Sequence, residues 1–331
     1  GEGATSKVWL GRFGPTRCEV AAKVVRKADM NEEELGWIRD EIAIHKRLRH
    51  PHVCTLHGAL ESPTTLTIVL ALCRGGSLCD TMGRALETNS PIPEARLHST
   101  FLQLCGALHY CHRHGVVHRD LKLDNLCWAD QRERTLILID FGYAATSNEQ
   151  SNFAGSPAYA APEVHHAIEP GGAPFVATAT DVWSAGVCLF AMLATQLPFN
   201  GSEVRDHNPS PICDALPRVC LQPHRPHLLP PFPLRVRHPD LDCLPSTLIA
   251  EPFAQPQAPQ ETEEDLCALR AKVCAGVWDS QPQDRSEGAL DLVTGMLQVD
   301  TDSRLTLDDV CDHAWVGGQD KIPWRGANER L

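Results

Sequence analysis

One short stretch, VVHRDLKLDNL at residues 116–126, constrains the chain more than any other feature. Asp120, Lys122 and Asn125 lie two and five residues apart, so a tight loop can direct all three side chains into one site. The trio offers a carboxylate that accepts a proton, an ammonium that neutralises phosphate and an amide that holds a metal. With His118 and Arg119, these identities would arise by chance in about one chain of this length in ten thousand. A merely solvated charged loop is therefore a poor alternative.

A second polar site follows in LILIDFG at residues 136–142, where Asp140 comes directly after an apolar run. A carboxylate at the exit of a buried strand is well placed to bind Mg²⁺, which prefers hard oxygen ligands and phosphate oxygens. Three further motifs occur downstream, namely GSPAYAAPE at 155–163, DVWSAGV at 181–187 and DSRLT at 302–306.

The hydrophobic pattern divides the chain into a strand-rich part and a helix-rich part. Strands are expected over KVWLGRF, EVAAKVV, HVCTLHGAL and LTIVLALC, with one helix at residues 31–48 between the second and third. Beyond CRGGSL the pattern becomes helical, and residues 93–112 form an amphipathic helix. This arrangement predicts two lobes that enclose a ligand cleft.

Charge and cysteine usage narrow the class of partner and the compartment. The 331 residues carry a formal net charge of −12, which disfavours nucleic acid and anionic membranes as partners and mildly favours basic substrates. None of the fourteen cysteines forms a CxxC pair, so reduced thiols in the cytoplasm or nucleus are expected. The charge-free run at 182–202 is interrupted by Gln196, Pro198 and Asn200 and suits a buried core helix better than a membrane span.

The stretch at about 200–262 differs in kind from the rest. Thirteen of the 25 prolines fall between Pro209 and Pro259, so this segment is expected to be a disordered or extended insertion. Two alternatives stay open, namely PxxP ligands for SH3-like domains and zinc ligation in a spacing that matches no standard structural site. The zinc alternative would use Cys213, Cys220, His224 and His227. We assign the insertion no function.

These motifs, in this order, resemble the eukaryotic protein kinase family over nearly the whole chain except the insertion. The resemblance implies an α+β, two-lobe kinase fold, with a small β-rich N-lobe at 1–73 and a larger helical C-lobe at 74–331. GEGATSKVWLG at 1–11 then corresponds to the glycine-rich nucleotide loop, with Ser6 in the third glycine position. Since the strand that leads into this loop is absent, we expect the chain to be a fragment of a longer protein.

The resemblance also implies ATP and Mg²⁺ as cofactors and assigns the site residues. Lys23 would hold the α- and β-phosphates and pair with Glu41, Asp120 would be the catalytic base, and Lys122 would steady the γ-phosphate. Asn125 and Asp140 would hold Mg²⁺. The predicted ATP-binding residues are Gly1, Glu2, Gly3, Ala4, Val8, Ala21, Lys23, Leu70 and Leu72.

Three more assignments follow from the same resemblance. Glu163 would form a structural ion pair with Arg304, and Asp181 would brace the catalytic loop. Within the activation segment, candidate residues are Ser151 and Ser156. Asn152 stands where relatives carry a phosphorylated Thr, so either activity is independent of phosphate or the modified residue is Ser151.

The motifs look most like serine/threonine kinases of the calmodulin-dependent and AMP-activated-kinase-like group, with protein substrates. Asp124 could select basic peptides, although Ser77 stands where such kinases often carry Glu. Two other functions are disfavoured by these motifs. A pseudokinase scaffold is disfavoured because the catalytic set is complete, and a small-molecule phosphotransferase is disfavoured by GSPAYAAPE and the helices after it.

Overall fold

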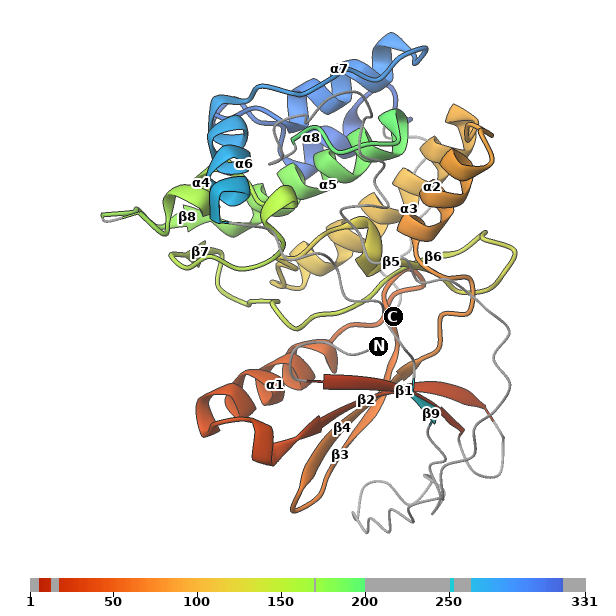
Figure 1. Cartoon of the computed structure of the whole chain (residues 1–331), viewed down its shortest axis with the longest axis vertical. Helices are drawn as coiled ribbons and strands as arrows, with labels where there is room; N and C mark the ends of the chain where they lie inside the picture. The colour runs from red at the N-terminus through yellow and green to blue at the C-terminus, as the bar shows by residue number, and fades with distance from the viewer. Residues whose placement is uncertain (1–5, 13–17, 170, 200–250, 253–262, 318–331) are drawn as a thin grey trace.

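The computed structural model describes residues 6–12, 18–169, 171–199, 251–252 and 263–317. The predicted nucleotide-loop residues Gly1, Glu2, Gly3 and Ala4 lie outside these ranges, as does the proline-rich insertion apart from residues 251–252. The described chain divides into a sheet with one helix and a larger, mostly helical part (Figure 1).

Five strands form one antiparallel sheet in the order β3-β4-β2-β1-β9. Their bounds are β1 Ser6–Arg12, β2 Glu19–Arg26, β3 Leu56–Glu61, β4 Thr65–Ala71 and β9 Glu251–Pro252. A short 3₁₀ turn, η1 (Lys27–Asp29), follows β2. The register pairs Val8 with Lys23 and Ala21 with Leu70, so these four side chains share one face of the sheet.

Helix α1 (Glu32–His45) covers part of the sheet and carries Glu41. Its start is a capping box, in which the Asn31 side chain accepts from the Glu34 N–H while the Glu34 carboxylate accepts from the Asn31 N–H. Ile38 and Ile42 pack with strand residues such as Val25 in one apolar cluster. The predicted helix is present, and its buried face includes the polar residues Glu41 and His45.

The helical part is built around a long amphipathic helix, α3 (Glu94–Arg113), whose predicted apolar face is buried. The other helices are α2 Leu78–Glu87, α4 Pro162–His166, α5 Ala177–Ala194, α6 Glu263–Ala275, α7 Glu287–Met296 and α8 Leu307–Asp312. Short elements connect them, namely β5 Leu126–Trp128, β6 Leu136–Leu138, β7 Glu149–Gln150, β8 Phe175–Val176, η2 Leu123–Asn125 and η3 Pro157–Tyr159.

Helix α5 is long and apolar enough to cross a membrane, but 83% of it is buried inside the protein. It contacts α3, α7 and α8 within the large core cluster that most of the helical part shares. Those contacts are what a core helix of a folded lobe makes, which agrees with the expectation for this apolar run.

The segment that joins the two lobes departs from the sequence expectation. LTIVLALC was expected to be a strand through Cys73, but β4 ends at Ala71. The backbone N–H groups of Arg74 and Gly75 donate instead to the carbonyls of Ala129 and Trp128, in and beside β5. Those bonds draw the chain away from the sheet and into the helical lobe. The α+β, two-lobe architecture itself is confirmed.

Candidate active site

The Lys23 ammonium lies between two carboxylates that come from other parts of the chain. Its Nζ atom is 2.9 Å from Glu41 Oε1, 3.0 Å from Glu41 Oε2 and 3.2 Å from Asp140 Oδ1. Strand β2, helix α1 and the segment after β6 therefore meet at one point. Glu41, rather than a first-turn glutamate of α1, is the partner of Lys23.

Lys23 and Asp140 stabilise each other's charged forms, whereas burial raises the pKa of Glu41 and the Asp140 charge adds to that effect. Desolvation lowers the pKa of Lys23, but the Asp140 and Glu41 carboxylates outweigh it and raise that pKa above its ordinary value. Desolvation likewise raises the pKa of Asp140, while the Lys23 charge and hydrogen bond bring it below its ordinary value. Lys23 is thus a fixed cation and Asp140 a fixed anion at neutral pH.

Gly142 lets the backbone pass close to this charged trio. A Cβ atom at this position would lie 3.3 Å from Asp140 Oδ1 and 3.7 Å from Lys23 Nζ. Asp140 itself has a φ of 58°, a left-handed conformation that is uncommon for a residue with a side chain. Such conformations persist where surrounding contacts hold them, and they gather at functional sites.

Phe141 links the charged trio to the catalytic loop. Its fully buried ring lies 4.7 Å from the His45 ring on α1 and 5.0 Å from the His118 ring, centroid to centroid. The His118 Nε2–H donates to the carbonyl of Ile139 at 3.0 Å. These ring contacts therefore connect helix α1 to the catalytic loop.

Three polar side chains, two from the catalytic loop and one from the activation segment, surround Asp120, which is buried. Asn125 Nδ2 donates to the backbone carbonyl of Asp120 at 2.7 Å and to its Oδ2 at 3.0 Å. Lys122 Nζ lies 3.1 Å from the same Oδ2. Ser156 Oγ donates to Asp120 Oδ1 at 2.9 Å and accepts from Lys122 Nζ at 2.8 Å. The carboxylate is thus held in one orientation from both sides.

Asp181 holds the backbone of this loop through hydrogen bonds, as expected. Its side chain is fully buried, and its carboxylate accepts 2.8 Å hydrogen bonds from the backbone N–H groups of His118 and Arg119 and from His112 Nε2. Burial raises the pKa of Asp181, but the hydrogen bond and charge of His112 hold it below its ordinary value. These bonds fix the loop although Arg119 has a φ of 67°.

A backbone hydrogen bond links the segments that carry the two predicted metal ligands. The Ile139 N–H, one residue before Asp140, donates to the backbone carbonyl of Asn125 at 2.9 Å. Amide and carboxylate oxygens suit Mg²⁺. Within the described residues, no group of three or more His, Cys, Asp or Glu side chains is placed to hold a metal ion. The donor set therefore fits an ion that takes its other ligands from phosphate oxygens and water.

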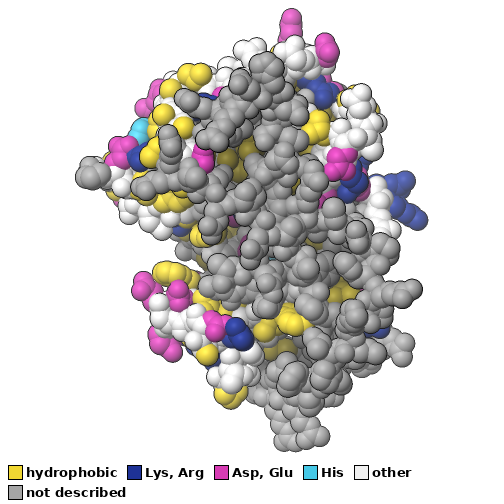
Figure 2. Space-filling model, viewed as in Figure 1, with side chains coloured by type: hydrophobic (Ala, Val, Ile, Leu, Met, Phe, Trp, Pro, Cys, Tyr) yellow, Lys and Arg dark blue, Asp and Glu magenta, His cyan; other side chains and the backbone are white. Residues whose placement is uncertain are grey.

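The predicted nucleotide-binding side chains of the sheet lie on the face that carries Lys23. Val8 is paired with Lys23 across β1 and β2, and Ala21 with Leu70 across β2 and β4. All are partly exposed, as is Leu72 in the connection to the helical lobe. The surface is indented between the sheet part and the helical part at one edge of the space-filling view (Figure 2).

The activation segment is tied to the catalytic loop at several points. Val117 and Ala145 exchange backbone hydrogen bonds of 2.9 and 3.0 Å, and β7 pairs with β8 near the start of α5. Arg119 donates to Asn152 Oδ1 at 2.7 Å and to its backbone carbonyl at 3.2 Å. Ser151 is exposed, whereas Ser156 lies in the catalytic loop contacts described above.

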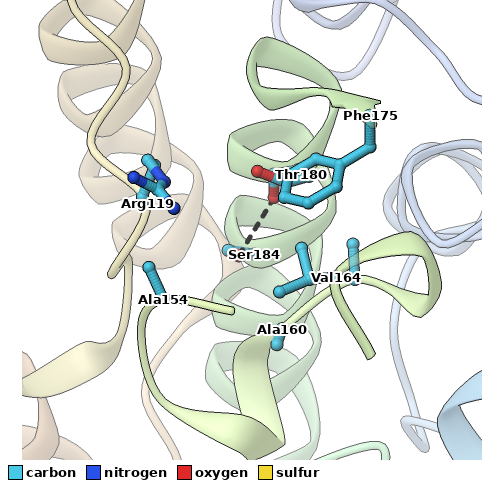
Figure 3. Close-up of a pocket in the computed structure, with 8 residues that line it drawn as sticks. Arg119, Ala154, Ala160, Val164, Phe175, Thr180 and Ser184 are labelled. Carbon is cyan, nitrogen blue, oxygen red and sulfur yellow. Dashed lines mark hydrogen bonds between the residues drawn. The ribbon is translucent and has the colours of Figure 1, made fainter. Parts of the chain in front are cut away.

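A small pocket lies between Arg119, the activation segment and α5 (Figure 3). Phe175, Val164 and Ala160 supply apolar walls, and the Ser184 hydroxyl donates to the Thr180 carbonyl at 3.0 Å. The Arg119 side chain lies at the edge of this pocket opposite Thr180. The activation segment thus borders this pocket together with Arg119, which also donates to Asn152.

The Glu163–Arg304 ion pair is present within the helical lobe. Arg304 Nη1 and Nη2 donate to the two Glu163 oxygens at 2.7 and 2.9 Å. The guanidinium also donates to the carbonyls of Gln298, Ala179 and Val299 and lies 5.0 Å from the centre of the Trp183 ring. This pair fixes the end of the activation segment to the core of the lobe.

Three contributors to the site had no assigned role in the sequence analysis. His45 lies on the buried face of α1 and contacts Phe141, and Gly142 approaches the charged trio. Ser156 was placed only in the activation segment, whereas its hydroxyl bridges Asp120 and Lys122. No regular spacing in the sequence links these three residues to the catalytic residues, because their contacts depend on how the chain folds.

Comparison with known proteins agrees with this geometry. The family model described as the protein kinase domain matches residues 1–316. Serine/threonine-protein kinase SIK2 of Gallus gallus is 35% identical over 204 residues, which cover 61% of this chain and 24% of that protein. Maternal embryonic leucine zipper kinase of Danio rerio is 30% identical over 331 residues, which cover 98% of this chain and 38% of that protein.

This chain therefore spans less than two fifths of the length of either relative. Both relatives are named as kinases, which agrees with the resemblance found in the motifs. The chain belongs to the protein kinase family.

Proposed function

We propose that this chain is an ATP-dependent protein kinase that transfers the γ-phosphate to serine or threonine hydroxyls of intracellular protein substrates. The observation that carries the proposal is the convergence of Lys23, Glu41 and Asp140 within 3.2 Å, next to a catalytic loop that orients Asp120. Fixed cations and oxygen ligands of this kind position a triphosphate and stabilise its developing charge.

Each residue has a distinct task in this mechanism. Asp120 accepts the proton of the substrate hydroxyl, and Lys122 and Ser156 hold its carboxylate in place. Lys23, fixed by Glu41, contacts the phosphates of the bound nucleotide. Asn125 and Asp140 would hold Mg²⁺, which supplies charge neutralisation between the phosphates.

Phosphotransfer to a peptide array in the presence of Mg²⁺ and labelled ATP tests this function. Asp120→Asn removes the proton acceptor but keeps the size of the side chain, so we expect turnover to fall by several orders of magnitude with little change in ATP affinity. Asp130→Asn, an exposed aspartate in the turn after β5, is the matched control. Equal turnover of Asp120→Asn and wild type would refute the proposal.

We further propose that the substrates are basic peptides. Asp124 supports this, because its Oδ2 is buried and lacks a hydrogen-bond partner among the described residues. Burial raises the pKa of Asp124, the Lys122 charge opposes that effect, and the Asp80 and Asp120 charges add to it. An arginine or lysine of the substrate would relieve both. If Asp124→Asn leaves the preference for basic peptides on the array unchanged, this assignment is wrong.

We also propose that activation does not require phosphorylation of the activation segment. Asn152 supports this, because its side-chain oxygen accepts a hydrogen bond from Arg119 at 2.7 Å. It stands at the position where relatives carry a phosphorylated Thr. Phosphatase treatment should then leave turnover unchanged, and Asn152→Ala should lower it. A loss of turnover on phosphatase treatment that Ser151→Ala reproduces would favour the alternative control through Ser151.

We also propose that the boundary between the two lobes lies near residues 73 and 74. It is supported by the end of β4 at Ala71 and by the hydrogen bonds from Arg74 and Gly75 to the β5 region. A cytoplasmic or nuclear location is supported by the thiols of the described cysteines, which form no disulfides with one another.

A further inference from the structure

The edge strand β9 comes from the proline-rich insertion, although the chain on both sides of the insertion belongs to the helical lobe. Helix α5 ends at Ala194 before it, and helix α6 begins at Glu263 after it. Both helices contact other elements of that lobe. Residues 251–252 instead join the five-stranded sheet, where they pair with β1 (Figure 1). The insertion therefore reaches the sheet that carries Lys23.

Strand β1 is the edge of this sheet that suits an added strand. It pairs with β2 in unbroken register from Ser6 to Arg12. On the opposite edge, β3 shifts its register against β4 between Leu56 and Gly58. Such an irregularity twists an edge strand and discourages further pairing, whereas an unbroken edge presents a regular row of N–H and C=O groups. The pairing of β9 with β1 rather than β3 follows from this difference.

The sequence of the insertion suits strand pairing at one place. Between Pro209 and Pro259, the longest run without proline is STLIAE at residues 246–251, and its last residue is the first residue of β9. Proline lacks the N–H that a ladder needs, so this run offers the most consecutive donors in the tract. Its Thr and Ile are residue types favoured in strands. Pro252, the second residue of β9, is tolerated because β9 is an edge strand.

The register identifies the two residues that bond across the edge. Leu10 lies opposite Glu251, and Trp9 lies opposite Pro252. Opposed residues of an antiparallel ladder alternate between pairs that exchange both hydrogen bonds and pairs that exchange none. Because Pro252 has no N–H, it cannot belong to an exchanging pair. Leu10 and Glu251 are therefore the pair whose N–H and C=O groups face each other, and the N–H of Trp9 points toward β2.

This bonded position borders the predicted nucleotide-binding face. Leu10 lies opposite Ala21 of β2, and Val8 lies opposite Lys23. Side chains at alternate positions of a strand share one face, so Leu10 is on the face that carries Val8, Ala21 and Lys23. A strand bonded to the outer edge at Leu10 therefore restrains the part of β1 that presents Val8.

We propose that the insertion holds β1 in place for nucleotide binding, through the backbone pairing of Glu251 with Leu10. The insertion is then part of the framework of the ATP site rather than a passive connection between α5 and α6. The effect on ATP rests on the proposed kinase function, whereas the pairing does not. The two statements are tested separately.

Hydrogen exchange of backbone amides in the full chain, resolved at single residues, tests the pairing. Glu251→Pro removes the donating N–H, whereas the matched control Glu251→Ala keeps it. We expect exchange at Leu10 to become about two- to tenfold faster in Glu251→Pro, the range for one net hydrogen bond, and to stay unchanged in Glu251→Ala. The Trp9 amide should be unaffected in both variants.

Three results would overturn the pairing. The first is unchanged exchange at Leu10 in Glu251→Pro. The second is equal acceleration in Glu251→Ala, which would assign the effect to the side chain instead of the backbone. The third is equal acceleration at Trp9 and Leu10, which would show a general loosening of β1 and contradict the assigned register. Circular dichroism checks that both variants are folded.

Calorimetric titration of ATP with Mg²⁺ tests the consequence for the nucleotide site. We expect Glu251→Pro to bind ATP about two- to tenfold more weakly than Glu251→Ala, and Glu251→Ala to match the wild type. Faster exchange at Leu10 with unchanged ATP affinity would overturn the effect on the site. Wild-type protein that does not bind ATP would instead count against the kinase function, while the exchange rates still decide the pairing.

Discussion

The buried Glu163–Arg304 ion pair can be compared with an exposed ion pair of the same shortest distance, to measure how its surroundings change the free energy of unfolding. Arg304 Nη1 lies 2.7 Å from Glu163 Oε1, and the two side chains are 1% and 15% exposed. Arg26 and Asp29 form a pair with the same 2.7 Å separation, but their side chains are 70% and 44% exposed. The two pairs therefore share their shortest separation and differ in burial and in the second hydrogen bond that Glu163 accepts.

Glu163→Ala leaves the Arg304 guanidinium inside the helical lobe without its carboxylate. Removing one partner of a buried pair costs about 3–5 kcal/mol. Three backbone carbonyls and the Trp183 ring remain around the cation, so we expect the lower end, about 3 kcal/mol of unfolding free energy. Asp29→Ala removes a surface pair, for which we expect less than about 1 kcal/mol.

Urea unfolding followed by circular dichroism measures both changes, and unchanged slopes against urea would show that the comparison is valid. The double variant Glu163→Ala with Arg304→Met should recover part of the loss, because an unpaired buried charge is then no longer present. If Glu163→Ala and Asp29→Ala cost the same, burial of the ion pair is not what stabilises this part of the lobe.

Two further predictions concern the charged trio and a buried histidine. Lys23→Met removes the cation fixed by Glu41 and Asp140, so kcat/KM for phosphotransfer should fall by about 10²–10³-fold, and a fall below tenfold in steady-state assays would contradict this role. Burial lowers the pKa of His165 to about 4, so the unfolded state binds its proton first as the pH falls. The contribution of His165 to the free energy of unfolding is therefore complete above about pH 6.5 and declines below it, by about 2 kcal/mol at pH 5. Urea unfolding at pH 7 and pH 5 measures this decline, and His165→Gln should remove the share that comes from His165. An identical decline in the variant would show that other groups cause it.

The sequence predicted those parts of the site that lie close together along the chain. Asp120, Lys122 and Asn125 occupy one loop, so their meeting follows from short spacing, and the apolar run before Asp140 marks a strand exit. The buried faces of α1 and α3 follow from helical periodicity, which reflects the need to bury apolar side chains. The Lys23 and Glu41 assignments came from family resemblance rather than from pattern.

What the sequence did not predict depends on contacts between distant segments. Ser156 reaches Asp120 across 36 residues, and no local pattern specifies which activation-segment hydroxyl does so. Strand β4 ends at Ala71 because Arg74 and Gly75 bond to the β5 region, although the apolar run continues beyond that point.

The dependence of ATP affinity on Mg²⁺ tests most directly whether these segments form one metal-bound triphosphate site. Calorimetric titration of ATP with and without Mg²⁺ should show tighter binding with the ion in wild type and in the surface variant Asp29→Ala. In Asp140→Asn, which lacks the proposed metal-binding carboxylate beside Lys23, the advantage of Mg²⁺ should be largely lost. An undiminished Mg²⁺ effect in Asp140→Asn would contradict the account.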